Sequence, residues 1–231
     1  MMERFGKINL IHDDCMNYIR SLPDNAYDLA IVDPPYGIGI GKCKIIGKRS
    51  EAKHRRYTFY QSGDWDAQVP NKEYFDHLFR VSKSQIIWGA NYFSGIVDFS
   101  LFSWIVWKKP YIMDTLSFGM GELAVYSGKK PLRIFDCNHD GNRVSSGNHA
   151  LARANAKIHQ CQKPVRLYKW LLKQYANAGD KILDTHLGSG SICLACHDGG
   201  FEMTGIEIDA DYYAGARERL KRHQMQNRID F

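Results

Sequence analysis

The stretch Asp28-Leu-Ala-Ile-Val-Asp-Pro-Pro-Tyr36 is a short apolar run followed at once by an acid, two prolines and an aromatic ring. Apolar runs of this length are typical of buried strands in parallel sheets. Ligands of open α/β sheets bind at the carboxyl ends of such strands. The sequence therefore predicts a ligand site at Asp33, Pro34, Pro35 and Tyr36.

A second stretch, Lys181-Ile-Leu-Asp-Thr-His-Leu-Gly-Ser-Gly-Ser191, has the form strand, Gly-x-Gly turn, helix. The next apolar run ends at Glu207, at the spacing from Gly188 and Gly190 where an acid meets ribose hydroxyls in dinucleotide folds. A nicotinamide site is disfavoured, because Cys193 stands where the third glycine of G-x-G-x-x-G is expected. The pattern instead favours an adenosyl-type cofactor.

The rest of the chain alternates strand-type and helix-type segments. We expect an α/β fold with a doubly wound, mostly parallel Rossmann-like sheet and helices on both faces. All 231 residues are assigned to one domain. The expected strands are 8–12, 28–32, 85–88, 103–107, 122–126, 181–184 and 201–208, and the clearest helices are 15–21, 71–82, 164–178 and 211–226.

Composition limits the protein class. The six cysteines are scattered, and Cys193 and Cys196 have no second pair that would complete a zinc site, so no metal is expected. The sequence has no signal-type apolar region and no membrane-spanning stretch, so a cytoplasmic protein is expected. The net charge of +6 is compatible with nucleic-acid binding.

The first motif suits a planar amino group. The Asp33 carboxylate and the Pro34 carbonyl can each accept one amino hydrogen and stabilise positive charge that develops on the nitrogen. Pro34 and Pro35 stiffen the loop, and Tyr36 offers a face for a base taken out of a duplex. These residues are the predicted catalytic set.

Together the two motifs resemble the DPPY-type amino-DNA methyltransferases of the beta group, in which the catalytic motif precedes the cofactor motif. His159-Gln-Cys-Gln-Lys-Pro164 and Gly205-Ile-Glu-Ile-Asp209 resemble further family segments. The resemblance implies S-adenosylmethionine as cofactor. The cofactor-binding residues implied are Asp14, Lys163, Asp184, His186, Gly188, Gly190 and Glu207.

Two residues depart from the family pattern Asp-Pro-Phe-x-Gly-Ser-Gly. Thr185 replaces the proline and His186 replaces the phenylalanine, so the wall beside the cofactor is expected to be more polar. His186 either contacts the cofactor or is satisfied by a neighbouring group.

Two stretches look suited to double-stranded DNA. A glycine-rich basic loop at about 37–65 follows Tyr36, and a short segment at about 131–158 occupies the place of the family's target-recognition region. The predicted DNA-binding residues are Lys42, Lys44, Lys48, Arg49, Arg55, Arg56, Arg133 and Arg143.

The resemblance implies site-specific methylation of adenine N6 in DNA, as in restriction–modification systems, since family members with Asp before Pro-Pro-Tyr usually act on adenine. Cytosine N4 is the alternative base, because the same acceptors suit either amino group. A catalytically silent DNA-binding module of this fold is the alternative outside enzymes. A homodimer is a further expectation, and a membrane partner is not expected.

Overall fold

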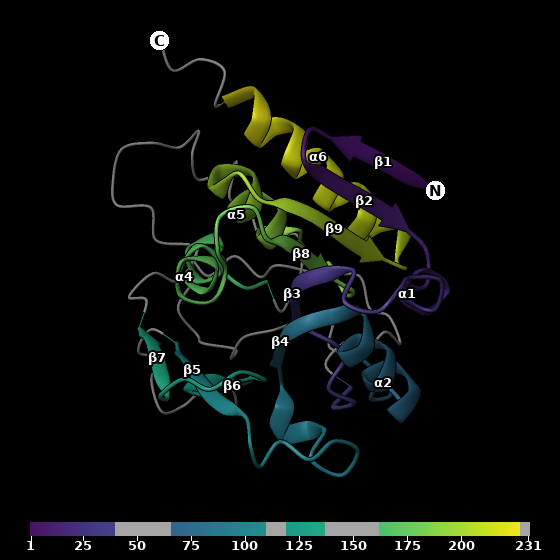
Figure 1. The fold of residues 1–231 in the computed structure, drawn as a ribbon. Helices are drawn as coiled ribbons and strands as arrows, with labels where there is room; N and C mark the ends of the chain where they lie inside the picture. Colours follow the sequence, from purple (N-terminus) through teal and green to yellow (C-terminus); the bar gives the residue numbers. More distant parts are fainter. Residues whose placement is uncertain (40–65, 110–118, 137–161, 227–231) are drawn as a thin grey trace, which may run out of the picture.

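The computed structural model describes residues 1–39, 66–109, 119–136 and 162–226. Their strands form one sheet in the order β1-β2-β9-β8-β3-β4-β6-β5-β7. β1, β2 and α6 lie at one end of this sheet, and β5, β6 and β7 lie at the other (Figure 1).

The centre of the sheet is the parallel block that the sequence predicts. β3 (Tyr27–Val32) pairs in parallel with β4 (Ser82–Trp88) and with β8 (Lys181–Asp184). β9 (Glu202–Glu207) and β2 (Ile8–His12) continue the parallel order beyond β8. The carboxyl ends of these five strands therefore meet along one edge of the sheet.

Three strands differ from the expectation or were missed by it. β1 (Met2–Phe5) pairs antiparallel with β2, and β7 (Arg133–Asp136) pairs in parallel with β5 (Ser103–Lys108). β7 falls inside the stretch expected to recognise DNA. β6 (Gly121–Tyr126) runs antiparallel between β4 and β5, so its first residues lie at the edge where β4 ends.

Helices cover both faces of the sheet, as expected. α4 (Val165–Tyr175), α5 (Ser191–Gly199) and α6 (Ala210–Gln226) contribute to one apolar cluster. α1 (Cys15–Ile19) and α2 (Lys72–Val81) contribute to the other. The predicted start of α2 is confirmed by the Asn71 side chain, which accepts a hydrogen bond from the Tyr74 amide at 3.0 Å.

The central strands are buried on both faces because both helical layers pack on them. Ile31 and Ile86 belong to one cluster, while Ala30 and Ile87 belong to the other. This alternation explains why the sequence of β3 is continuously apolar rather than alternating. Each fully buried isoleucine stabilises the fold by roughly 1.5–3 kcal/mol.

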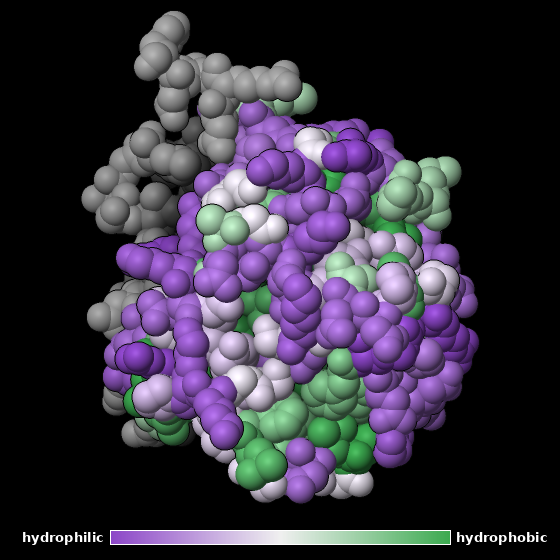
Figure 2. Space-filling model, in the orientation of Figure 1, coloured by the Kyte–Doolittle hydropathy of each residue, from purple (hydrophilic) through white to green (hydrophobic). Residues whose placement is uncertain are grey.

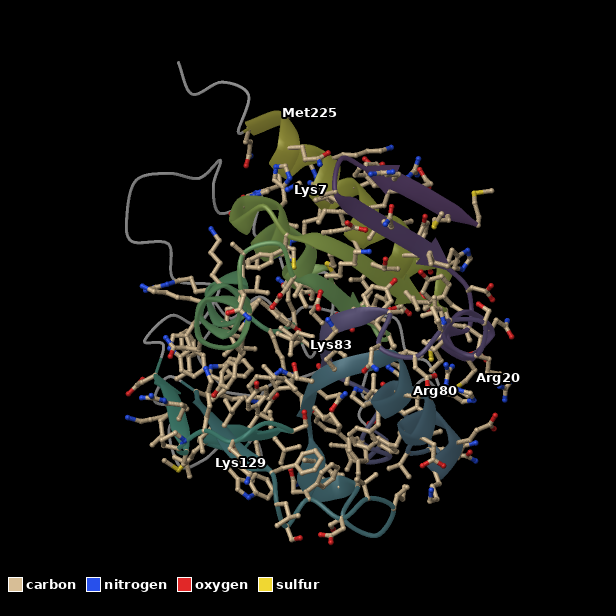
Figure 3. The ribbon with its side chains drawn as sticks, in the orientation of Figure 1. Lys7, Arg20, Arg80, Lys83, Lys129 and Met225 are labelled. Atoms are coloured by element: carbon tan, nitrogen blue, oxygen red, sulfur yellow. The ribbon has the colours of Figure 1, made fainter. Side chains whose placement is uncertain are left out.

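The surface is mixed in character. In Figure 2, apolar residues gather at the bottom of the view, where Figure 1 draws the segment between β4 and β5. Of the basic side chains labelled in Figure 3, Arg20, Arg80 and Lys83 form ion pairs with nearby carboxylates. No helix in the described part of the chain is both long and apolar enough to cross a membrane.

Candidate active site at the carboxyl edge of the sheet

The sheet brings the predicted acidic residues to one edge. Asp33 directly follows β3, Asp184 ends β8 and Glu207 ends β9. Asp14 follows β2, whose last residue His12 is paired with Glu207. β8 pairs in parallel with both β3 and β9, so the two predicted motifs lie side by side at this edge.

The Asp33 carboxylate is already engaged by two groups of the chain. The Tyr36 hydroxyl donates to Oδ1 at 2.6 Å, and the Lys163 ammonium donates to Oδ2 at 2.5 Å. Both contacts fix the carboxylate, which is half-buried. A carboxylate oxygen has two acceptor positions, so each can still accept a further donor.

The Pro-Pro-Tyr loop is held by Asp66, which the sequence analysis missed. The buried Asp66 carboxylate accepts from the backbone amides of Tyr36 and Gly37 at 2.7 and 3.0 Å. Hydrogen bonds to an ionised acceptor are the stronger kind, so the loop is preorganised before any ligand binds. No local pattern around Asp66 distinguishes it from an ordinary loop aspartate.

The Tyr36 ring has a defined seat. It stacks on the Tyr92 ring with a centroid distance of 4.9 Å and an interplanar angle of 14°. A Cβ added at Gly89 would lie 2.1 Å from Tyr36 Cε1, and Gly89 has a φ of +71°, so this position requires glycine. Tyr92 is 45% exposed and belongs to none of the predicted motifs.

The glycine turn is closed by Glu207. Its carboxylate accepts from the Gly188 amide at 2.7 Å and from the Asp209 amide at 2.9 Å. Gly188 and Gly190 have φ of +51° and +67°, and a Cβ on Gly190 would lie 2.9 Å from Ala216 Cβ. Burial raises the pKa of Glu207, although its amide donors oppose that shift.

This donor and acceptor set fits an adenosyl cofactor. Each Glu207 oxygen accepts one backbone amide and retains a second acceptor position that can take a ribose hydroxyl. Asp14 is exposed two residues after His12, the strand partner of Glu207, and one of its oxygens caps α1 by accepting from the Met16 amide at 2.8 Å. The glycines leave the turn without side chains that would block a ligand.

Asp184 and Thr185 are buried polar residues, and His186 beside them is partly buried. Asp184 accepts from the His186 amide at 3.0 Å, and burial raises the pKa of this carboxyl to about 8. His186 Nδ1 lies 2.9 Å from the Thr185 hydroxyl, which also contacts the Tyr74 hydroxyl at 2.7 Å. Burial lowers the pKa of His186 to about 4, so its ring is neutral at pH 7. One ring nitrogen is thus satisfied by a neighbour.

The Asp184 shift predicts a pH-dependent stability. The pKa of Asp184 in the folded state, about 8, exceeds the ordinary value of 3.8. The contribution of Asp184 to the free energy of unfolding is therefore complete at low pH and is lost as the pH rises through about 8. Asp184→Asn should therefore gain in melting temperature relative to wild type between pH 6 and 9, at roughly 2–4 °C per kcal/mol.

Asp28→Asn is the matched control for this measurement. The backbone amide of Lys181 and the Lys83 side chain lower the pKa of Asp28, so its contribution is constant above pH 6. If the melting temperatures of wild type and Asp184→Asn change in parallel between pH 6 and 9, Asp184 is ionised throughout this range and the prediction is wrong.

Lys163 lies against the Asp33 carboxylate. Its ammonium is paired with Asp33 and lies 3.1 Å from Glu122 Oε2, and Glu122 is paired in turn with Lys109 at 2.6 Å. Nothing in the local sequence around Glu122 and Lys109 shows that β6 begins at this edge, so neither residue was predicted. The predicted cofactor contact of Lys163 remains a prediction.

Most predicted DNA contacts fall outside the described residues. Lys42, Lys44, Lys48, Arg49, Arg55, Arg56 and Arg143 all lie in 40–65 or 137–161. Arg133 is described, and it is exposed on β7. Within the described ranges, no group of three or more His, Cys, Asp or Glu side chains is placed to hold a metal ion.

Comparison with known proteins gives consistent relatives. A family model described as a DNA methylase matches residues 122–218. The type II methyltransferase M.HpaI of Haemophilus parainfluenzae is 26% identical over 91% of this chain and 73% of its own length. The type II methyltransferase M.ScaI of Streptomyces caespitosus is 24% identical over 92% of this chain and 81% of its own length.

Solved structures share the fold. The M1.HpyAVI–SAM complex superposes with a TM-score of 0.58 at 20% identity, over 92% of this chain and all of that one. The cytosine-N4-specific PvuII DNA methyltransferase also gives 0.58, at 11% identity, over 96% of this chain and 92% of its own. Asp33, Gly188 and Glu207 thus assemble at one sheet edge in a chain that is similar to N6-adenine/N4-cytosine DNA methylases.

Proposed function

We propose that this protein transfers a methyl group from S-adenosylmethionine to the exocyclic N6 of adenine in double-stranded DNA. The observation that carries the proposal is the Asp33 carboxylate, held by Tyr36 and Lys163 at the edge that also carries the Glu207–Gly188 turn. One group of residues suits an amino nitrogen and the other suits an adenosyl ligand.

The chain's own residues act by holding and polarising. Asp33 and the Pro34 carbonyl accept the two amino hydrogens, which favours a tetrahedral nitrogen and stabilises the positive charge that develops on it. Tyr36 stacks on the flipped base. Glu207 and the glycine turn hold the cofactor, with Asp14 and Asp184 as further candidates, while S-adenosylmethionine supplies the activated methyl group on its sulfonium.

Adenine is favoured over cytosine by a single position. Asp33 precedes Pro-Pro-Tyr, as in family members that act on adenine, whereas serine is usual for cytosine. Cytosine N4 remains the alternative, since a carboxylate and a carbonyl accept from either amino group.

Methylation of a plasmid library by the purified protein tests base, site and activity together. Modification-sensitive sequencing should detect N6-methyladenine within one short recurring sequence. Methylation at cytosine N4 would replace adenine as the base, and the absence of any modified base with bound S-adenosylmethionine would favour a silent DNA-binding module. Light scattering of the same sample tests the expected homodimer.

Tyr36 substitutions should separate base capture from hydrogen bonding. Tyr36→Ala removes the stacking face and should weaken capture of a flipped base by roughly 1–3 kcal/mol. Tyr36→Phe keeps the ring on Tyr92 but removes the hydroxyl that donates to Asp33, so capture should be largely preserved. Fluorescence of 2-aminopurine at the target position reports flipping. Equal losses in the two variants would assign the effect to the hydroxyl rather than the ring.

A further inference from the structure

Lys163 is a buried cation at the centre of an extended charge cluster. Its side chain is 2% exposed, and its ammonium lies between the Asp33 and Glu122 carboxylates. Lys109 pairs with the other oxygen of Glu122 at 2.6 Å. The four groups run in the order Asp33, Lys163, Glu122, Lys109, with alternating sign and no net charge.

The cluster is balanced so that each buried charge has an opposite neighbour. Burial alone would lower the pKa of Lys163, but Asp33 and Glu122 outweigh that effect and raise it. Burial alone would raise the pKa of Glu122, but Lys163 and Lys109 outweigh it and lower that pKa. Removal of one member would leave the cluster with a net charge in a site largely shielded from water, which is costly.

The geometry also orients the Asp33 side chain. Lys163 contacts Oδ2, whereas Oδ1 accepts from Tyr36, so the two oxygens have different partners. The Lys163 ammonium lies 5.1 Å from the centroid of the buried Trp88 ring, which limits where it can move. The contact to Glu122 is an ion pair without hydrogen-bond alignment, so Asp33 is the better directed partner.

Resting on the proposed function, we propose that Lys163 is a positioning residue for base methylation, anchored by Glu122 and Lys109. It fixes the Asp33 carboxylate with Oδ1 turned toward Tyr36 and available to the amino group of the base. In this role Lys163 acts through Asp33, which holds the base, and not through a contact with the cofactor.

Three variants test this role: Lys163→Met, Glu122→Gln and the double variant. Lys163→Met should lower the single-turnover methylation rate by about tenfold, since misplacement of a positioned group by an ångström costs up to about 10²-fold. Its affinity for S-adenosylmethionine should stay within about twofold of wild type, because Asp33 and not the cofactor loses its partner. It should also melt at a lower temperature, because two partly buried carboxylates lose their shared cation.

The double variant separates positioning from charge balance. Lys163→Met leaves two carboxylates, Asp33 and Glu122, with one ammonium, Lys109, and Glu122→Gln restores a net charge of zero. The double variant should therefore regain melting temperature while its methylation rate stays low. If the rate recovers together with stability, Lys163 only balances charge and the proposal fails. If Lys163→Met does not fold, the methylation rate of the double variant tests the proposal: a low rate supports it and a wild-type rate overturns it.

Two further outcomes would overturn the proposal. If Lys163→Met loses affinity for S-adenosylmethionine by the same factor as methylation rate, Lys163 acts in cofactor binding instead. A wild-type rate in the folded variant would remove Lys163 from the reaction. Wild-type protein that methylates no DNA would overturn the proposed function itself, so the two failures are distinguishable.

Discussion

Asp33→Ala should lower the methyl-transfer rate by about 10²–10³-fold, the usual cost of removing one preorganised group that stabilises developing charge. The carboxylate is held ready by Tyr36 and Lys163, so little reorganisation accompanies the reaction in the wild type. Cofactor affinity should change little, because Asp33 addresses the base. Single-turnover methylation and calorimetric titration with S-adenosylmethionine measure the two quantities separately.

Asp33→Asn is the matched control. It keeps the shape and one acceptor oxygen but removes the charge that pairs with Lys163. Its rate should fall between those of the wild type and Asp33→Ala. Both variants leave Lys163 with Glu122 as its remaining carboxylate neighbour, so their melting temperatures must be compared first. Near-wild-type turnover of a folded Asp33→Ala variant would remove the main support for the proposed function.

Glu207→Ala should weaken S-adenosylmethionine binding by about 1.5–3 kcal/mol, the range for hydrogen bonds to a charged group. The structure gives a second reason for a large effect. The same carboxylate accepts from the Gly188 and Asp209 amides, so its removal also releases the glycine turn that would carry the cofactor. Calorimetry on the folded variant measures the loss.

Glu207→Gln distinguishes these two contributions. The side-chain oxygen of glutamine can still accept a hydrogen bond from the turn, but its NH2 group cannot accept one. The affinity of Glu207→Gln for S-adenosylmethionine should therefore lie between those of wild type and Glu207→Ala. Asp211→Ala is a surface control in the first turn of α6, and its affinity should be unchanged. Unaltered affinity in folded Glu207→Ala would exclude Glu207 from the cofactor site.

The sequence by itself determined the fold class and the positions of both motifs. The apolar runs of β3 and β8 are continuous because both faces are buried, and the residues that follow them have strong turn chemistry. Asp33 and Glu207 were identified because each stands at the end of a recognisable strand, and Gly188 because it lies in the glycine turn that follows one. Such signals are local, lying within a few residues of the position that they predict.

The tertiary structure alone decided which side chains meet at the site. Lys163 contacts Asp33 across 130 residues of chain, and Asp66 reaches Tyr36 across 30. The antiparallel β6 carries Glu122 to the same edge. The turn after β4 places the Tyr92 ring against one face of the Tyr36 ring. These contacts depend on strand order and direction, which local periodicity does not encode. An ion pair between distant residues leaves no repeating pattern, so only the assembled sheet reveals it.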